Sequence, residues 1–282
     1  MDNKNILISL LHWNDTLELI GQVEYYEQRR VDILIIDNGS NEPSIERLQM
    51  FVDDRPNIEI LWNGENLGFG TALNKGFHYA RQNQYEHALY SNNDTRWLLG
   101  DLDILMSALH SSDYLLIYPL LHEGNRNCIG GRGLESELNT RVYADDDNQI
   151  VDYAPGTLFV IDLTIFDQLD YLDSRYFFGG ELAHLCGRMR EAHMRFGRTD
   201  QVIIEHSQDR SFNPTKTYYN WRNRFIYIRS FSQKVIYHSM RWTAILLIQL
   251  VLSLIRVDTE RSRTAFYALY HGLSRRVGKW DV

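Results

Sequence analysis

Three polar motifs follow one another in the first hundred residues, and their positions beside apolar segments strongly constrain the fold. Residues 37–40 (Asp-Asn-Gly-Ser) and 92–94 (Asn-Asn-Asp) each end a run of strand-forming side chains. Residues 66–70 (Asn-Leu-Gly-Phe-Gly) open a segment with helical spacing. Strands that alternate with helices form a parallel sheet, which binds nucleotides at the carboxyl ends of its strands. The motifs therefore predict a polar crevice at that end of a sheet.

The alternation of segments continues through the first half of the chain. Enrichment in β-branched and aliphatic residues predicts strands at residues 6–11, 33–36, 58–62, 87–91, 114–118 and 158–161. Helices are predicted between the earlier strands, at residues 15–29, 43–53, 70–83 and 100–110. This order predicts an α/β fold with a mostly parallel sheet and helices on both faces. Residues 122–150 are polar and predict a long surface excursion or hairpin.

Composition limits the class of protein. A chain of 282 residues with 44% hydrophobic and 23% charged residues fits one sizeable domain with an appendage. The two cysteines, Cys128 and Cys186, provide neither a disulfide framework nor metal-ligand spacing, which predicts a reduced, cytoplasmic setting. The N-terminus lacks a basic region followed by an apolar stretch and a cleavage site, so no signal peptide is expected.

Charge is distributed unevenly along the chain. Residues 216–282 contain twelve Lys or Arg against three Asp or Glu, a net charge of +9, which leaves −17 on residues 1–215. An acidic body does not suit nucleic acid, which binds to basic surfaces, so no nucleic-acid partner is expected. A basic tail with interspersed aromatic and aliphatic residues suits an anionic membrane surface. The alternative is an ordinary solvated helical face.

The most apolar part of the chain is residues 241–256. Its uninterrupted span is shorter than the roughly 20 residues that a membrane-crossing helix needs. Gln249, Ser253, Arg256 and Glu260 recur at helical spacing and predict a narrow polar stripe. A helix that lies in the membrane interface fits this pattern, and a helix buried against the sheet or a second subunit fits it about as well.

Each motif has a chemical and a purely structural interpretation. The carboxylate of Asp37 can accept a hydrogen bond from the imide N–H of uracil or thymine, although its motif is also a common turn sequence. Gly68 and Gly70 let the backbone at a helix N-terminus approach a diphosphate. Asp94 after Asn92 offers oxygen to Mg²⁺ or Mn²⁺, or belongs to an Asn-rich turn.

Taken in order, these motifs resemble glycosyltransferase family two, the inverting GT-A enzymes, and especially its rhamnosyltransferase-like bacterial members. The resemblance spans nearly the whole chain. The further residues that carry it are Asn74, Gly76, residues 151–157, residues 176–178, Glu181, Leu185, Cys186, Arg188, His206, Ser211, residues 218–219, Arg222 and Asn223.

The resemblance implies a role for individual residues. Asp37 would recognise the pyrimidine base. Asp94 would be the last residue of a DxD-like motif and hold the metal on the donor diphosphate, with His206 as a second ligand. Arg222 would contact phosphate oxygens. The remaining donor-binding positions are Asn66, Gly68, Gly70, Asn74 and Asn92.

The acidic motif that supplies the general base departs from the family pattern. Family members usually carry Glu-Asp, and then Asp two residues later, before Leu-Cys, whereas here Leu182 and His184 stand at the two Asp positions. Transfer with inversion needs a base within hydrogen-bond reach of the acceptor hydroxyl. Glu181 is the natural substitute, and His184 shares its helical face as a second candidate. The alternative is a glutamate favoured by the helix dipole beside an ordinary histidine.

These observations predict a GT-A catalytic domain at residues 1–230 and a helical, membrane-docking region at residues 231–282. The predicted reaction moves a sugar from dTDP-rhamnose or a UDP-sugar to a hydroxyl of a glycan acceptor, which is expected to be lipid-linked, at the inner face of the plasma membrane. Two other functions stay open: a catalytically silent relative that binds nucleotide or glycan, and a nucleotidyltransferase. The second lacks support, because residues 12–15 (His-Trp-Asn-Asp) replace the Gly-rich, basic loop expected after the first strand.

Overall fold

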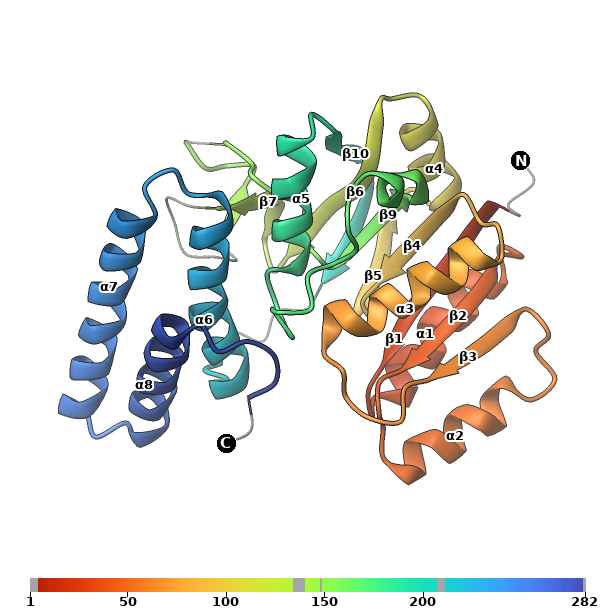
Figure 1. The fold of residues 1–282 in the computed structure, drawn as a ribbon. Coiled ribbons are helices and arrows are strands. Elements are labelled where there is room, and N and C mark those ends of the chain that lie inside the picture. Colours follow the sequence, from red (N-terminus) through yellow and green to blue (C-terminus); the bar gives the residue numbers. More distant parts are fainter. Residues whose placement is uncertain (1–4, 134–139, 148, 207–210, 281–282) are drawn as a thin grey trace.

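The computed structural model describes residues 5–133, 140–147, 149–206 and 211–280 (Figure 1). The strands are β1 (Ile6–His12), β2 (Asp32–Asp37), β3 (Ile58–Trp62), β4 (His87–Ser91), β5 (Thr95–Leu99), β6 (Tyr114–Glu123), β7 (Arg126–Arg132), β8 (Thr140–Tyr143), β9 (Leu158–Asp162) and β10 (Arg195–His206). The helices are α1 (Thr16–Glu27), α2 (Glu42–Val52), α3 (Phe69–Gln82), α4 (Leu102–His110), the short 3₁₀ helix η2 (Leu163–Asp167), α5 (Glu181–Glu191), α6 (Pro214–Phe231), α7 (Val235–Ile255) and α8 (Thr259–Ser274).

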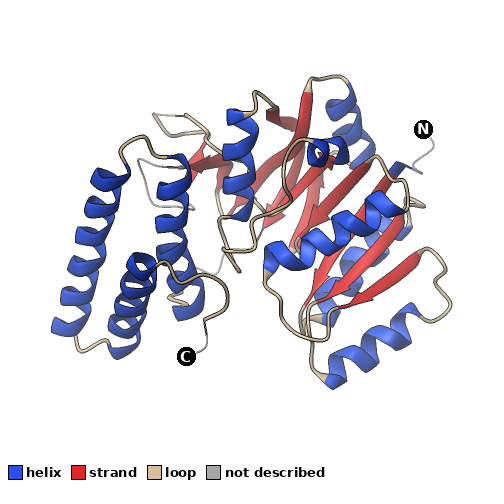
Figure 2. Cartoon of the chain, viewed as in Figure 1, coloured by secondary structure: helices blue, strands red, loops and turns tan. Residues whose placement is uncertain are grey.

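One central sheet organises the chain (Figure 2). Its strand order is β3-β2-β1-β4-β9-β6-β10-β5, and the β7–β8 hairpin continues from β6. Strands β3, β2, β1 and β4 are mutually parallel, as the alternating pattern predicts. The carboxyl ends of these four strands lie at the same end of the sheet, so the turns that follow them meet there.

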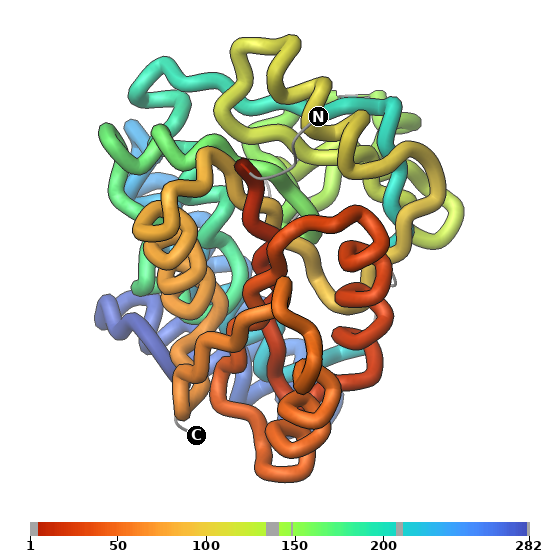
Figure 3. Tube along the Cα trace, turned by 90° about the vertical axis from the view of Figure 1, so that its right-hand side faces the viewer, coloured from red at the N-terminus to blue at the C-terminus, as the bar shows by residue number. Residues whose placement is uncertain are grey.

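Helices cover both faces of the sheet. Apolar residues of α1, α2 and α4 pack on one face, and those of α3 and α5 pack on the other. Figure 3 shows α1 and α3 on opposite sides of the N-terminal strands. The α/β class and the two helical layers agree with the expectation from the sequence.

The sheet is more mixed than the apolar pattern indicates. Strand β9 runs antiparallel to both β4 and β6, and β5 runs antiparallel to β10. Neither β5 nor β10 is among the predicted strands, because both carry charged side chains and expose much of their length. The expected excursion at residues 122–150 includes the β7–β8 hairpin, although residues 134–139 and 148 lie outside the described part.

Three helices follow the sheet and pack together. Helix α6 contacts both α7 and α8, and α7 contacts α8. The predicted polar stripe on one helix is wrong, because the helix ends after Ile255 and Glu260 belongs to α8. Ser253 is buried against its neighbours instead of facing outward. The predicted boundary at residue 230 falls within the last turn of α6, and the division into two domains stays a prediction.

Candidate active site

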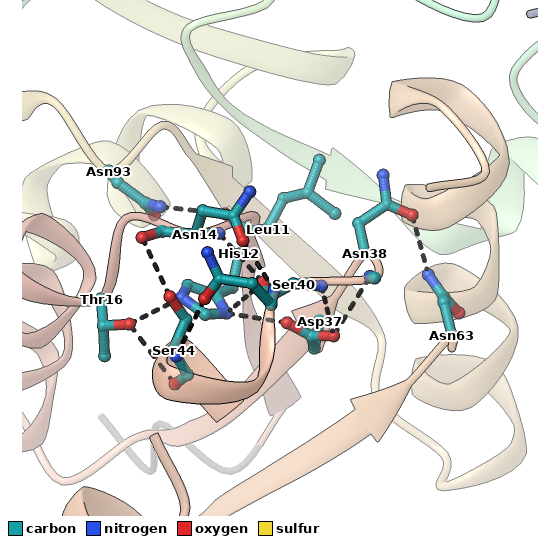
Figure 4. Close-up of polar contacts among 12 residues, drawn as sticks. Leu11, His12, Asn14, Thr16, Asp37, Asn38, Ser40, Ser44, Asn63 and Asn93 are labelled. Atoms are coloured by element: carbon teal, nitrogen blue, oxygen red, sulfur yellow. Dashed lines mark hydrogen bonds and ion pairs between the residues drawn. The ribbon is translucent and has the colours of Figure 1, made fainter. Parts of the chain in front are cut away.

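The ends of β1 and β2 are joined by a buried polar network (Figure 4). His12 Nδ1 lies 2.9 Å from Asp37 Oδ1, and His12 Nε2 lies 3.1 Å from Thr16 Oγ1. The backbone N–H groups of Gly39 and Ser40 donate to Asp37 Oδ2 at 3.1 and 3.2 Å. These contacts hold the turn after β2 in a fixed conformation.

The network determines what Asp37 can contact. Its side chain is buried, and both carboxylate oxygens already accept hydrogen bonds from within the protein. Burial alone would raise the pKa of Asp37, but hydrogen bonds from His12 and Ser40 outweigh burial and lower it. The structure therefore places Asp37 beneath the surface of the crevice, and its role in recognising a base stays a prediction.

The amide side chains around Asp37 shape the surface of the crevice. Asn38 Oδ1 accepts from the backbone N–H of Leu67 at 3.0 Å, and Asn66 Oδ1 accepts from that of Gly68 at 2.9 Å. Gly68 has a φ of +83°, and a Cβ there would lie 2.4 Å from the carbonyl oxygen of Phe177. Only glycine fits this approach of two loops, so Gly68 fixes the start of α3.

A first hollow, which we call the Trp13 hollow, opens above these residues with a volume of about 530 Å³. Trp13 follows β1, is 56% exposed and lines it, as do Asn38 and Asn66. Its volume and the exposed aromatic ring suit a small ligand with a flat ring. The sequence analysis did not single out Trp13, and its only signal was a large aromatic residue in a polar strand-end turn.

A second hollow, the Glu181 hollow, adjoins the first and has a volume of about 470 Å³. Five residues line both hollows: Phe69, Asn92, Asp94, Phe178 and Lys216. The hydroxyl of Tyr90 donates to Asn92 Oδ1 at 2.7 Å, which fixes the asparagine between the hollows. Lys216 in the first turn of α6 is the second lining residue that sequence reasoning missed.

Asp94, which lines both hollows, lies beside His206, which lines the Glu181 hollow, although 112 positions separate them. Asp94 Oδ2 lies 3.3 Å from His206 Nε2. Burial alone would lower the pKa of His206, but Asp94 and Glu123 outweigh burial and raise it to about 9. Burial alone would raise the pKa of Asp94, but the hydrogen bond with His206 outweighs it and lowers the pKa. The structure thus brings together the two residues that the sequence proposed as metal ligands.

This pair fits a divalent metal by donor type and spacing. Two ligand atoms bound at right angles, each about 2.1 Å from one metal ion, lie about 3 Å apart, close to the observed separation. The described residues contain no group of three or more His, Cys, Asp or Glu side chains suited to a metal. Two protein ligands suffice where substrate phosphates and water complete the coordination, as is usual for Mg²⁺.

Glu181 begins α5 and reaches the Glu181 hollow with its carboxyl group only 2% exposed. Burial raises the pKa of this group to about 7, although backbone hydrogen bonds at Gly179 and Gly70 oppose the shift. A Cβ on Gly70 would lie 3.0 Å from Glu181 Cγ, so this glycine makes room for the carboxylate. A carboxyl group that titrates near neutral pH is suited to general base catalysis.

His184 does not lie in the same hollow as Glu181. Its imidazole Nε2 is 3.4 Å from Asp173 Oδ2 and 3.3 Å from Ser230 Oγ, and its ring packs against Tyr176 and Phe231. Burial lowers the pKa of His184 to about 4. The sequence interpretation of a Glu181–His184 pair therefore has no support in the geometry, and Glu181 remains as the base candidate.

Two predicted donor-binding residues contact the protein itself. Asn74 donates from Nδ2 to the carbonyl of Leu172 at 2.7 Å and accepts from its N–H at 2.9 Å. The guanidinium of buried Arg222 donates to the carbonyls of Tyr176, Arg276 and Gly278. Neither Asn74 nor Arg222 lines the two hollows. Lys216 lines both hollows and Arg141 lines the Glu181 hollow, so these two cations are placed to contact an anionic ligand there.

Residues 13–169, more than half of the chain, match the family described as Glycosyl transferase family 2. The chain belongs to glycosyl transferase family 2. It is a glycosyltransferase that uses a nucleotide-sugar donor, and its α/β sheet with two helical layers is the GT-A fold.

Two similar proteins match this chain over different lengths. It is 26% identical to the low-salt glycan biosynthesis hexosyltransferase Agl10 of Haloferax volcanii, over 88% of this chain and 84% of that protein. It is 24% identical to the N-acetylglucosaminyl-diphospho-decaprenol L-rhamnosyltransferase of Mycobacterium tuberculosis, over 58% of this chain and 62% of that protein.

A solved glycosyltransferase shares the fold at low sequence identity. The mannosyltransferase PcManGT of Pyrobaculum calidifontis, in complex with GDP-Man and Mn²⁺, superposes with a TM-score of 0.61 at 10% identity. The similarity covers 96% of this chain and 88% of that one.

Proposed function

We propose that the protein transfers a hexosyl residue, from dTDP-rhamnose or a UDP-sugar, to a hydroxyl group of a glycan acceptor with inversion at the anomeric carbon. The observation that carries this proposal is the buried carboxyl group of Glu181, which shares a hollow with Asp94 and His206. A carboxyl group with a pKa of about 7 is partly deprotonated at neutral pH, so it can accept a proton, and it is a stronger base than an ordinary carboxylate.

In this mechanism Glu181 acts from one side of the reacting carbon. Its Oε1 is buried and makes no hydrogen bond to the described residues, so it can accept the proton of an acceptor hydroxyl. The acceptor oxygen then bonds to the anomeric carbon while the bond from that carbon to the donor phosphate oxygen breaks. Because the nucleophile and the leaving group lie on opposite sides, the configuration inverts.

Asp94 and His206 would hold a divalent metal, Mg²⁺ or Mn²⁺, against the donor diphosphate. When bound, the metal would offset the negative charge that develops on the leaving diphosphate. Lys216 lines both hollows and adds a positive charge near the same group. Trp13 would stack on the base, with Asn38 and Asn66 supplying amide contacts at the edge of the hollow.

The acceptor is proposed to be lipid-linked, and the enzyme is proposed to work in bacterial surface polysaccharide synthesis at the inner face of the plasma membrane. The name of the mycobacterial rhamnosyltransferase describes a lipid-linked acceptor for that protein. Helix α7 has 21 residues and is longer than the apolar run at residues 241–256, whose length alone fell short of a membrane crossing. With a mean hydropathy of 1.4 the helix is long and apolar enough to cross a membrane, which supports the membrane assignment. Only 17% of its apolar window is buried, which argues against a helix packed on the sheet and leaves contact with a second subunit as the alternative.

The test is sugar transfer by Glu181→Gln compared with the wild type. A thermal-shift screen of UDP, dTDP and GDP sugars with and without Mn²⁺ first identifies the donor. Glu181→Gln should bind that donor normally but transfer sugar about 10²- to 10⁴-fold more slowly, and NMR of the wild-type product should show the inverted anomer. Transfer at the wild-type rate by the variant would refute the assignment of Glu181. A screen in which no nucleotide sugar stabilises the protein would favour the silent relative.

A further inference from the structure

His206 lies between two carboxylates that come from different parts of the sheet. Its Nε2 faces Asp94, and its Nδ1 lies 3.5 Å from Oε1 of Glu123, the last residue of β6. Glu123 is 0% exposed and lines neither the Glu181 hollow nor the Trp13 hollow, but it lines a third hollow together with Asp94 and His206. It faces the imidazole from the side opposite to Asp94.

Glu123 is itself held by the β7–β8 hairpin. Arg141 places a guanidinium nitrogen 3.3 Å from Glu123 Oε1, and the hydroxyl of Tyr143 donates to Oε2 at 3.4 Å. Both residues belong to β8. A buried carboxylate costs stability unless it is paired and hydrogen-bonded, and these contacts provide both. The position of Glu123 relative to His206 is therefore fixed by the sheet.

The order of contacts determines which nitrogen of His206 can bind a metal. A carboxylate near Nδ1 favours a proton on that nitrogen, so Nε2, which faces Asp94, is the nitrogen that would bind a metal in place of its own proton. A histidine that binds a metal commonly donates its other N–H to a carboxylate, which orients the ring and increases its basicity. His206 lies between Asp94 and Glu123 in the order that this arrangement requires, with Nδ1 3.5 Å from the Glu123 carboxylate.

We propose that Glu123 is the positioning residue that orients His206 as a ligand of the divalent metal. This inference rests on the proposed metal-dependent function, and it gives the β7–β8 hairpin a role in that function through Arg141 and Tyr143. Glu123 does not contact the reacting atoms, so its effect is on metal affinity. Glycosyl transfer changes only as a consequence.

The experiment is a titration of the full chain with Mn²⁺ in which electron paramagnetic resonance measures the free ion. It is done with and without UDP, dTDP or GDP. Glu123→Ala should weaken Mn²⁺ binding about 10- to 100-fold. Glu123→Gln should weaken it less, because the amide oxygen of Gln can still face Nδ1 of His206. Asp94→Asn tests the proposed ligand itself.

Glu205→Gln is the matched control. Glu205 precedes His206 on β10 and forms an ion pair with Arg96, so its replacement removes a nearby charge without touching the imidazole. Mn²⁺ binding should be unchanged in this variant. The melting temperature in EDTA separates a metal effect from damage to the fold, since a merely structural role would lower that temperature without a selective loss of affinity.

The outcomes distinguish this inference from the proposed function. If the wild type binds no Mn²⁺ with any nucleotide, the metal-dependent function and the inference both fail. If Asp94→Asn loses Mn²⁺ while both Glu123 variants bind like the wild type, only the inference fails. If Glu205→Gln weakens binding as much as Glu123→Gln, the effect is one of general charge and the inference also fails. Should Glu123→Ala not fold, the comparison of those two Gln variants decides.

Discussion

At the scale of single residues, Glu181 combines burial with a place in an open hollow. Its neighbours exclude water from the carboxyl group, and burial raises its pKa to about 7. The sequence identified this residue as the first acid of an altered motif, but the motif gave no information on its protonation. That property arises only when α5 packs beside Gly70 at the start of α3.

The pKa of Glu181 predicts how activity depends on pH. A base must be deprotonated to accept a proton, so kcat/KM should rise with pH and level off above an apparent pKa of about 7. Initial rates from pH 5 to 9 at saturating Mn²⁺ measure this rise of kcat/KM with pH. The residual activity of Glu181→Gln should not show the rise. An unchanged rise in the variant would show that another group controls the rate.

Glu181 also predicts how stability depends on pH. Its pKa in the folded protein exceeds the ordinary value of 4.5, so ionisation opposes folding as the pH rises from about 4.5 to about 7. Glu181→Gln removes this penalty. The variant should melt at a higher temperature than the wild type at pH 8, and the difference should shrink toward pH 5. A constant difference across this range would contradict the raised pKa.

At the scale of elements, buried polar side chains connect helices to loops around the site. Asn74 on α3 forms two hydrogen bonds to the backbone of Leu172 in the segment before α5. Arg222 on α6 donates to the backbone near Tyr176 and to the segment after α8. Both residues carry the family resemblance, yet their contacts place them in the framework that surrounds the hollows.

Asn74 provides a test of this framework role. Asn74→Ala leaves the N–H and C=O of Leu172 without their partner, which should lower the free energy of unfolding by about 1–3 kcal/mol. The KM for the donor should stay near the wild-type value, because Asn74 does not line either hollow. Urea unfolding and donor kinetics measure the two effects.

The control for this test is Asn83→Ala at the other end of α3, where the exposed amide donates only to the carbonyl of Tyr79. That change should alter stability much less. A raised donor KM without loss of stability in Asn74→Ala would restore the role that the sequence predicted for Asn74.

At the scale of the whole molecule, α7 presents apolar side chains outward from the three-helix unit. Ile248 and Ile255 are 57% and 72% exposed, while Trp242 and Leu246 face inward. This is the reverse of an ordinary surface helix, whose exposed side is polar. The basic charge of residues 216–282 lies in the same part of the chain. These properties together favour an anionic bilayer as the surface that α7 contacts.

The membrane proposal predicts the behaviour of variants in vesicle sedimentation. The double change Ile248→Glu and Ile255→Glu should reduce binding to vesicles that contain anionic lipid, since buried carboxylates oppose contact with the acyl chains. Met50→Glu is the control, because Met50 on α2 is 80% exposed but lies far along the chain from the tail. Equal binding of the wild type, the double variant and Met50→Glu would refute docking through α7.

The sequence by itself determined the α/β class, the order of strands and helices in the first half, and the residues that meet at the strand ends. It could do so because periodic apolar runs and glycine turns act locally. The tertiary structure decided which candidates share a hollow, since that depends on contacts between distant segments. It placed Asp94 beside His206 and left Glu181 in the hollow without His184. It also buried Asp37, and it brought Trp13 and Lys216 to the hollows and Glu123 to His206 through packing that no local pattern records.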